Sequence, residues 1–268
     1  MIARRSLITC LSAVALAAML ALPAAAQAPG GTLDAILKRG KVLIGMDMSA
    51  PPFAYQDEKQ QPAGSEVETA RLIAKDLGVE LEIVPTSAAN RIPYLVTGRV
   101  DMMMGAFSIF PDRAKSVWFS APYGSVTSVI MGPVGLAAKA YGDLAGKKIS
   151  VSRGTYTEQV MMAALPKDVQ IVRFDDDAQA MAAMASGQVD AYGVGNVPGS
   201  ALIKRFPGKY DIKIIIPPRN WYSIGVRSGD TDLLQWLNTF VFFHRENGDL
   251  KKIYESIIGD TLPPPPVL

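Results

Sequence analysis

The 268-residue chain has a single cysteine, Cys10, and a single histidine, His244. This scarcity excludes a disulfide scaffold and a zinc site built from several Cys and His ligands. Any Ser-His-Asp or Cys-His catalytic group would have to use His244, which we expect at the surface of a late helix. The formal net charge of +2 gives no reason to expect a nucleic-acid partner. We therefore expect no metal, no cofactor and no nucleic acid.

Long hydrophobic runs are also missing, apart from one at the start. Arg4 and Arg5 precede an apolar run from Leu7 to Leu22, and small residues follow up to position 26. The run is shorter than the roughly 20 residues that span a membrane, and its layout is typical of a secretory signal peptide. Residues 1–26 are therefore predicted to be removed on export to the periplasm, by the general or the twin-arginine route. The remaining chain would be formally neutral and free of cysteine.

Strand and helix signals alternate along the rest of the chain. The helix predicted over 65–77 has a regular apolar face, a start that fits a capping box (Ser65 to Glu68), and Gly78 at its end. The first series of elements is a strand over 41–45, this helix, a strand over 80–84, a helix over 90–97 and a strand over 100–104. The second series has strands over 147–151, 169–174 and 189–194 and helices over 157–165 and 177–186. This order favours α/β sheets.

The two series also share short motifs in matching places. Gly98-Arg99-Val100-Asp101 in the first corresponds to Gly187-Gln188-Val189-Asp190 in the second, and a Gly-Lys pair precedes the first strand of each. Two echoes in the same order indicate two similar lobes. Open α/β sheets bind ligands at the carboxyl ends of their strands, so a cleft between the lobes is the expected site.

The end of the chain has a further strand signal over 222–226 and helices over 233–245 and 250–258, which have no third lobe to join. We predict that they return to the first lobe, with hinge crossings near 122–126 and 217–222. The predicted organisation is therefore lobe 1 over 33–123 and 222–262, lobe 2 over 124–221, and a proline-rich tail over 263–268.

A set of motifs, in this order, carries a resemblance to a known family. They are Gly45-Met46-Asp47, Pro51-Pro52-Phe53, Gly98-Arg99-Val100-Asp101, Pro111-Asp112-Arg113, Phe119-Ser120-Ala121-Pro122-Tyr123, Asp143-Leu144-Ala145-Gly146-Lys147 and Gly225-Val226-Arg227. Together they resemble the extracytoplasmic solute-binding proteins of family 3, which feed polar amino acids to ABC importers. The resemblance implies an α/β fold of two lobes, the type II periplasmic-binding-protein fold, with the ligand between them.

The resemblance also implies which residues meet the ligand. Arg113 matches the arginine that pairs with the α-carboxylate of the ligand, for which a planar guanidinium is well suited. Ser108 matches a ligand-contacting position, and Thr155 and Tyr156 lie in the loop that offers backbone N–H groups to the same carboxylate. Arg91 lies in a stretch that resembles the acidic amino acid binders of the family. It would supply a second cation for glutamate or aspartate.

Other positions depart from the family pattern. Gly195 stands where an acidic residue usually holds the ligand's α-ammonium group, and Ala106 replaces a common Ser or Thr. A buried ammonium needs an acceptor, which Asn196 or Asp47 could supply. Otherwise the ligand is an organic acid without an α-amino group. Asp175 to Asp177 are interpreted as a helix N-terminus, where acidic residues suit the helix dipole.

The expected function is capture of a small carboxylate-bearing ligand by hinge closure, followed by delivery to a membrane permease. We expect a monomer and no catalysis. The alternative is an enzyme on the same fold, similar to the periplasmic cyclohexadienyl dehydratases, which act on prephenate or arogenate and need a positioned acid.

Overall fold

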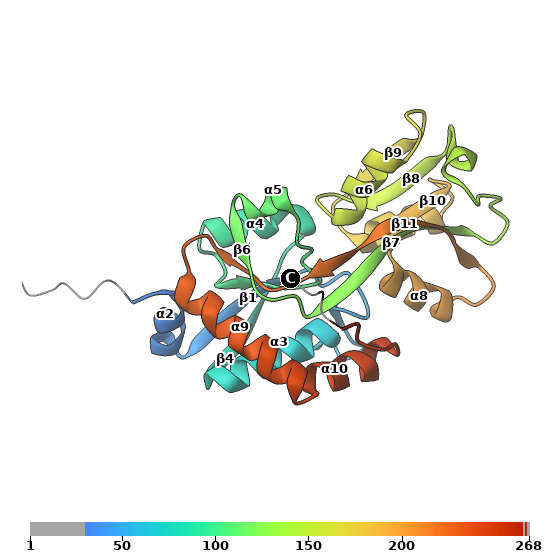
Figure 1. Cartoon of the computed structure of the whole chain (residues 1–268). Coiled ribbons are helices and arrows are strands. Elements are labelled where there is room, and N and C mark those ends of the chain that lie inside the picture. Colours follow the sequence, from blue (N-terminus) through green and yellow to red (C-terminus); the bar gives the residue numbers. More distant parts are fainter. Residues whose placement is uncertain (1–29, 265, 267–268) are drawn as a thin grey trace, which may run out of the picture. The chain divides into compact units, whose positions relative to one another are not determined.

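The computed structural model describes residues 30–264 and 266, and the predicted signal peptide lies outside the described residues. From Gly31 onward the chain forms one compact unit, which contains two five-stranded sheets (Figure 1). The two sheets correspond to the two series of elements expected from the sequence. The exact lobe boundaries stay a prediction.

The first sheet has the strand order β4-β1-β5-β12-β6. Its bounds are β1 Lys41–Met46, β4 Glu80–Pro85, β5 Met102–Met103, β6 Val117–Phe119 and β12 Gly225–Arg227. β1 is parallel to β4 and β5, whereas β12 runs antiparallel to β5 and β6. The late strand β12 thus completes a sheet that the first residues begin, because the chain returns to it.

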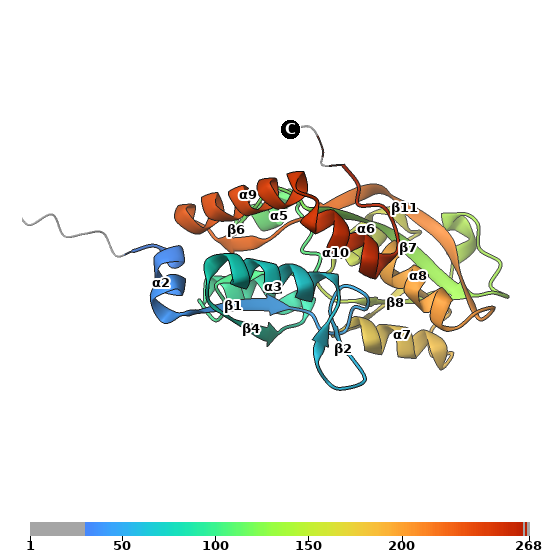
Figure 2. The ribbon, with the colours of Figure 1, turned by 90° about the horizontal axis from the view of Figure 1, so that it is seen from below.

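Helices cover both faces of the first sheet. α3 packs against β1 and beside α10 on one face (Figure 2), and the side chains of α4 join the apolar cluster on the other face. The helices of this part are α2 Thr32–Arg39, α3 Ser65–Leu77, α4 Arg91–Val96, α5 Pro111–Ala114, α9 Thr231–Glu246 and α10 Asp249–Ile258, with the 3₁₀ turn η1 over Ala88–Asn90 and the hairpin β2 Tyr55–Gln56 and β3 Pro62–Ala63. Met102, Met103 and Met104 are fully buried between these helices and the sheet.

The second sheet has the order β11-β7-β10-β8-β9. Its strands are β7 Gly124–Pro133, β8 Lys148–Ser152, β9 Gln170–Phe174, β10 Ala191–Gly195 and β11 Tyr210–Tyr222, and its helices are η2 Tyr141–Leu144, α6 Tyr156–Ala164, α7 Asp177–Ala185 and α8 Asn196–Arg205. Side chains of α7 and α8 join one apolar cluster and those of α6 another. The sheet is therefore covered on both faces, as the crossover helices of parallel strands require.

The strands β7 and β11 are long antiparallel neighbours (Figure 1). The start of β7 and the end of β11 are the segments in which the hinge crossings were predicted. Their register shifts between Ile216 and Asn220, where Pro217 and Pro218 cannot donate to the ladder. Beyond this shift, Gly124 to Val126 again pair with Asn220 to Tyr222.

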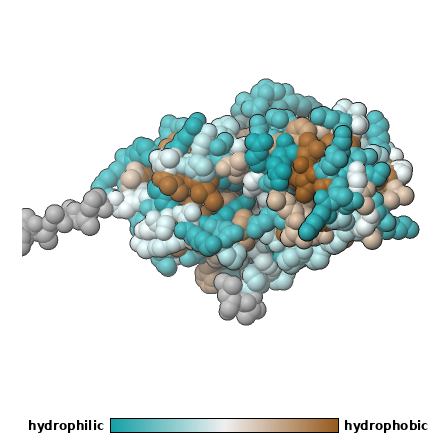
Figure 3. Space-filling model, turned by 90° about the horizontal axis from the view of Figure 1, so that it is seen from above, coloured by the Kyte–Doolittle hydropathy of each residue, from teal (hydrophilic) through white to brown (hydrophobic). Residues whose placement is uncertain are grey.

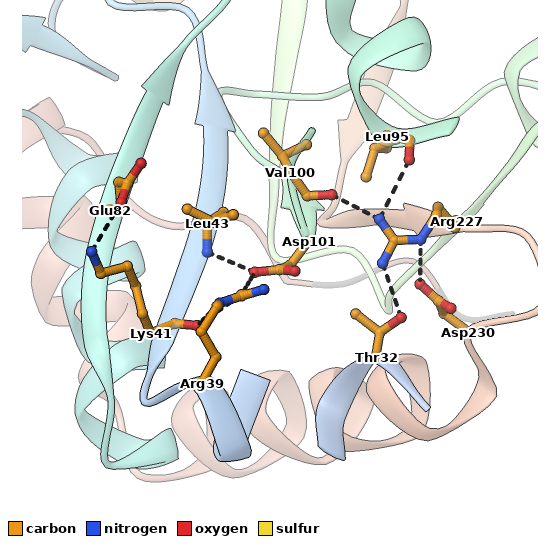
Figure 4. Close-up of polar contacts among 10 residues, drawn as sticks. All are labelled: Thr32, Arg39, Lys41, Leu43, Glu82, Leu95, Val100, Asp101, Arg227 and Asp230. Atoms are coloured by element: carbon orange, nitrogen blue, oxygen red, sulfur yellow. Dashed lines mark hydrogen bonds and ion pairs between the residues drawn. The ribbon is translucent and has the colours of Figure 1, made fainter. Parts of the chain in front are cut away.

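The echoed motifs make the same hydrogen bonds in the two sheets. The Asp101 N–H donates to the Leu43 carbonyl at 2.9 Å, and the Leu43 N–H donates to Asp101 Oδ2 at 2.7 Å. Asp190 forms the same reciprocal pair with Lys148, at 2.8 Å in both directions. Asp101 also accepts from Arg39 at the end of α2 (Figure 4). The motif therefore fixes the strand before each cleft loop to its neighbour.

The capping box predicted at Ser65 is wrong, although the helix bounds agree. Gly64 is the residue before the helix, and Ser65 Oγ has no partner among the described atoms. The Ser65 N–H instead donates to the Pro52 carbonyl at 3.0 Å, so an approaching loop takes the place of a side-chain cap. A Cβ at Gly64 would lie 2.2 Å from the Phe53 carbonyl oxygen, so only glycine allows this approach.

His244 is not at the surface, contrary to the prediction. It is 4% exposed, and its ring nitrogens lie 2.8 Å from Asp249 Oδ2 and 2.7 Å from Asp76 Oδ2. The imidazole thus links α9 to α10 and α3. Its position follows from the apolar face of α9, since the ring packs 4.6 Å from that of Phe240.

The surface shown in Figure 3 is largely hydrophilic, with separate small hydrophobic patches. Scattered apolar residues of this kind are ordinary on soluble domains. Within the described residues, none of the helices combines the length and the apolar composition that crossing a membrane requires.

Candidate functional site

A small cavity lies where loops from both sheets meet. We call it the inner chamber. Its volume is about 70 Å³, and it opens at the carboxyl ends of β5, β8 and β10, the edge at which α/β sheets bind ligands. Of the residues expected at the site, it is lined by Arg91, Ala106, Ser108, Thr155, Tyr156 and Gly195. The structure thus brings these residues together, whereas Arg113, Asp47 and Asn196 are placed differently.

Arg91 is a buried cation that forms no direct ion pair within the described residues. It begins α4 and is only 7% exposed. Its Nε has no hydrogen-bond partner, and within the described residues no carboxylate lies within ion-pair distance of the guanidinium. Leaving a buried charge without a partner costs several kcal/mol. The arrangement is therefore suited to an anionic group that enters the chamber.

Arg113 lies beside this cation and joins the two sheets. It is 5% exposed, in the short helix α5. Its Nη1 donates to the Ser108 carbonyl at 2.9 Å, and its Nη2 donates to the Gly154 carbonyl of the second sheet at 2.8 Å. Burial, and next the charge of Arg91, lowers the pKa of Arg113 to about 9. Arg113 thus stays largely charged at neutral pH, behind the residues that line the chamber.

The two cations share aromatic support. The guanidinium carbon of Arg113 lies 4.8 Å from the Phe107 ring centroid, and that of Arg91 lies 5.8 Å from the same centroid. Arg113 also lies 4.4 Å from the Phe110 centroid. Aromatic faces attract cations and replace part of their lost hydration. Positive charge is therefore concentrated at one end of the chamber.

Glu66 supports the loop between β5 and Ser108, and sequence reasoning missed it. Its Oε2 accepts hydrogen bonds from the N–H groups of Gly105 at 2.8 Å and Ala106 at 3.0 Å and from the Tyr123 hydroxyl at 2.5 Å. Ala106 has φ 51°, a strained conformation for alanine that the carboxylate helps to hold. Burial raises the pKa of Glu66, although these hydrogen bonds and Arg91 oppose the effect.

A signal for Glu66 was present in the sequence. Positions 66, 70, 73 and 77 share a helix face, and Ala70, Ile73 and Leu77 are apolar. A carboxylate on such a face must be buried with partners. The capping-box interpretation obscured this signal.

Ser108, Thr155 and Tyr156 are held by local contacts. Ser108 Oγ donates to Asn220 Oδ1 of β11 at 3.0 Å. Thr155 caps α6: its Oγ1 accepts from the Glu158 N–H at 3.1 Å and donates to the Ser152 carbonyl at 2.8 Å. The Tyr156 ring packs 5.9 Å from that of Phe110. The N-terminus of α6 therefore adjoins the chamber, where its dipole favours an anion.

The Asp47 carboxylate and the backbone of Asp177, on opposite sides of the cleft, are linked through the Ser49 hydroxyl. Asp47 follows β1, is 5% exposed and accepts from Ser49 Oγ at 2.7 Å. The same Ser49 oxygen accepts from the Asp177 N–H at 3.3 Å. Asp177, at the start of α7, also accepts from the Tyr192 hydroxyl at 2.8 Å and lines the inner chamber.

The environment of Asp177 favours its protonated form. Burial, and next the charge of Asp47, raises its pKa to about 6, while Tyr192 and Arg91 oppose the rise. The sequence suggested only a helix start at this position. That interpretation is confirmed for Asp176, whose side chain caps the helix, but the place of Asp177 in the cleft was missed because it depends on how α7 docks.

The structure does not bring Asn196 to the cavity. Its Oδ1 accepts from the Thr127 N–H at 2.8 Å and is therefore engaged with β7. Gly195 does line the inner chamber, and a Cβ there would lie 2.6 Å from Val126 Cγ2. Close packing against β7 thus explains the glycine, and among the described residues Asp177 is the carboxylate that lines the inner chamber.

A larger cavity, which we call the outer chamber, continues from the inner one. Its volume is about 810 Å³, and Ala50, Asp177 and Pro198 line both chambers. The outer lining also includes Asp47, Tyr55, Tyr94, Asp176 and Arg205. Asp177, which lines both chambers, therefore lies between a cationic inner end and a wide outer space that Asp47 and Asp176 also line.

Comparisons with known proteins agree with this architecture. The L-cystine-binding protein TcyJ of Escherichia coli is 29% identical over 232 residues, which cover 85% of this chain and 86% of that protein. A mutant of ArgBP from T. maritima superposes with a TM-score of 0.81 at 30% identity, over 85% of this chain and all of that one. The ancestral amino acid-binding protein AncCDT-1, a precursor of cyclohexadienyl dehydratase, gives a TM-score of 0.78 at 31% identity, over 85% and 99%.

Residues 42–260 match the family model of the bacterial extracellular solute-binding proteins, family 3. This range includes both sheets and both chambers. The similar solved structures are two-lobed binding proteins, so the expected fold class is confirmed. The chain belongs to the bacterial extracellular solute-binding proteins, family 3.

Proposed function

We propose that this protein is the solute-binding component of an ABC importer and captures an α-amino acid between its two lobes. The observation that carries the proposal is Arg91, a buried cation that has no ion-pair partner among the described residues and lines a chamber between the two sheets. An incoming carboxylate would relieve its unfavourable burial. The names of relatives that bind L-cystine and arginine agree with an amino acid ligand.

In this proposal the ligand's carboxylate occupies the cationic end of the inner chamber. Arg91 pairs with it directly, and Arg113 adds charge from behind Ser108. Guanidinium groups suit a carboxylate because their donors match its two oxygens. The N-terminus of α6, which begins after Thr155, supports the same negative charge.

The ligand's ammonium group pairs with Asp177. Asp177 begins α7, which packs on the second sheet, whereas Arg91 begins α4, which packs on the first. A zwitterionic ligand therefore contacts both sides of the cleft. This replaces the contact that sequence analysis sought at Asn196, whose oxygen is already engaged. A charge-assisted hydrogen bond from the ammonium group to ionised Asp177 would offset the repulsion between Asp177 and Asp47.

Such a ligand favours closure because it interacts with both faces at once. The cross-cleft hydrogen bonds from Arg113 to Gly154 and from Asp177 to Ser49 belong to the closed arrangement. The closed protein, exported to the periplasm, then docks on a membrane permease. A monomer suffices for this cycle.

Calorimetric titration of the refolded, ligand-free protein tests the proposal. The panel contains amino acids with acidic, neutral and basic side chains, their 2-oxo analogues without the amine, and the corresponding decarboxylated amines. Intact amino acids should bind, and Arg91→Met should weaken binding at least a hundredfold, about 3 kcal/mol. Arg71→Met is the matched control, because Arg71 is an exposed arginine paired with Glu68.

Binding of 2-oxo acids alone would replace the proposal by a carrier of amine-free organic acids. Binding of decarboxylated amines as tight as that of amino acids would remove Arg91 from the site.

One observation favours a second candidate, a dehydratase. Asp177 has a pKa of about 6, in the range that suits a general acid, and the similar AncCDT-1 is a precursor of cyclohexadienyl dehydratase. Incubation with prephenate distinguishes the candidates. A binding protein leaves prephenate unchanged. An enzyme would protonate the departing ring hydroxyl through Asp177 and form phenylpyruvate, water and CO2, at a rate that Asp177→Asn abolishes.

A further inference from the structure

We infer that the ligand is a dibasic amino acid, whose positively charged side chain extends into the outer chamber. This inference rests on the proposed function and specifies its ligand. It differs from the acidic ligand expected from the sequence around Arg91. The inference is based on three features of the cleft: the charges of its acidic residues, the volumes of its two chambers, and the aromatic residues of the outer lining.

The charges of the cleft call for more than one ligand cation. Asp47, Asp176 and Asp177 line the outer chamber, and within the described residues none of the three has an ion-pair partner; the neighbouring Asp175, by contrast, pairs with Arg153 at 3.3 Å. The α-ammonium group pairs with one carboxylate at the threshold, Asp177. Asp47 is 5% exposed, and a carboxylate buried to this degree calls for a further positive group.

The inner chamber alone is too small for a long side chain. Its volume of about 70 Å³ holds the head of an amino acid, whereas the outer chamber offers about 810 Å³. Asp177 lines both chambers. A ligand anchored by its carboxylate at Arg91 and by its amine at Asp177 therefore directs its side chain outward, past Asp47 and Asp176.

The outer lining suits an organic cation. Tyr55 and Tyr94 contribute aromatic faces, which attract guanidinium and ammonium groups. Arg205 is the basic residue of the described lining, and its exposed side chain lies over the Phe206 ring. The described residues hold no group of three acidic, His or Cys side chains placed for a metal ion. The acidic lining thus fits a charged side chain of the ligand.

Glutamate is disfavoured by the same features. Arg91 and Arg113 both support the inner end of the cleft, beside Phe107. A side-chain carboxylate that extends outward would meet Asp47 and Asp176 instead of a second cation. Repulsion between these like charges would weaken the binding of glutamate.

Matched pairs of amino acids test the inference, because each pair has nearly the same shape and differs in charge. We would measure dissociation constants for arginine against citrulline and for lysine against norleucine, with glutamate as a further probe. The dissociation constant of each basic amino acid should be lower than that of its uncharged partner by about tenfold or more. Glutamate should bind more weakly than citrulline.

Variants identify the groups responsible. Asp176→Asn keeps a good helix cap and should reduce the preference for arginine over citrulline several-fold, because arginine binding weakens more than citrulline binding. Asp47→Asn retains the acceptor for Ser49 and should act in the same direction. Asp175→Asn is the matched control, because it removes a neighbouring charge outside the chamber and should leave the preference unchanged.

The outcomes separate the two proposals. Equal binding within each pair, or stronger binding of glutamate, overturns the inference while the amino acid function stands. A preference that Asp176→Asn and Asp47→Asn both leave unchanged also overturns it. If no amino acid binds at all, the proposed function fails together with the inference.

Discussion

The two lobes share a scaffold but present different chemistry to the cleft. In each, a Gly-x-Val-Asp segment ends in an aspartate that exchanges two hydrogen bonds with a parallel-sheet strand, β1 in the first lobe and β8 in the second. At the cleft, the first lobe offers the buried cations Arg91 and Arg113, whereas the second offers a helix N-terminus and Asp177. Equivalent scaffolds can therefore carry opposite charges, because the loops beyond the strands are free to differ.

The support beneath these groups differs too. In the first lobe, the buried carboxylate of Glu66 holds the cleft loop through two backbone hydrogen bonds and accepts a third from the Tyr123 hydroxyl. In the second, Thr155 and Asp176 act as ordinary helix caps. The difference suggests that the first lobe is the rigid anchor for the ligand and the second the part that responds to it.

The largest expected effect comes from Arg91. Besides losing about a hundredfold in amino acid affinity, Arg91→Met should make the ligand-free protein more stable by about 1–2 kcal/mol, because a buried charge without a partner is removed. Thermal unfolding with and without ligand measures both changes. A less stable ligand-free variant would show that Arg91 already has a compensating partner.

Glu66→Ala should destabilise the protein by about 3 kcal/mol, since two backbone N–H groups and the Tyr123 hydroxyl lose their acceptor. It should also weaken ligand binding by moving Ala106. Glu68→Ala, an exposed change on the same helix, should stay within about 0.5 kcal/mol. Urea unfolding of the two variants provides the comparison, and equal losses would contradict the anchoring role of Glu66.

The echoed aspartates allow a direct comparison of the lobes. Asp101 is buried and pairs with Arg39, whereas Asp190 is partly exposed and lies 3.9 Å from Lys147. We expect Asp101→Ala to cost about 2–3 kcal/mol and Asp190→Ala about 1 kcal/mol, since water can replace the second acceptor. Urea unfolding measures both losses, and a larger loss at Asp190 would reverse the assignment of the rigid lobe.

A gradual effect, spread over about two pH units, is a pH dependence from Asp177. Its pKa of about 6 exceeds the ordinary value near 3.9, so the native state binds this proton more tightly than the unfolded state. Stability of the ligand-free protein should therefore fall by about 2 kcal/mol as the pH rises from 4 to above 6. Amino acid affinity should change in the opposite sense and rise with pH.

The measurement is the difference between the wild type and Asp177→Asn in unfolding free energy across this range. Subtraction removes the contributions of Glu66 and of the other titrating groups. A difference that is constant with pH would show that Asp177 has an ordinary environment.

Much of the fold could be predicted because local signals agree with tertiary packing. The helix over 65–77 combines a regular apolar face with glycines at both ends, and its bounds agree with the structure. No helix was predicted over 196–205, because Pro198 and Gly199 are typical of a turn and lie within the first turn of α8. Two prolines likewise disguise the long strand β11.

The candidate site was predictable only where a motif fixes a position. Arg91, Ser108 and Thr155 converge as the family resemblance implies, although their contact with a ligand stays a prediction. Asn196 turned out to bind the backbone of β7, because the side chain at a helix start is oriented by its nearest strand. Asp177 could not be found from its own sequence neighbours, since its environment is made by Asp47, Tyr192 and Arg91 from other elements.

The paired strands β7 and β11 have one more consequence. The two strands remain hydrogen-bonded to each other on both sides of the shift near Pro217. They would therefore bend together, and the lobes would move relative to each other only by opening and closing. Every contact in the cleft, whatever its chemistry, would then be converted into the same displacement. A permease that recognises only this displacement would not contact the ligand-specific residues. Substitutions within the chambers could then change the ligand while the docking surface for the permease stays the same.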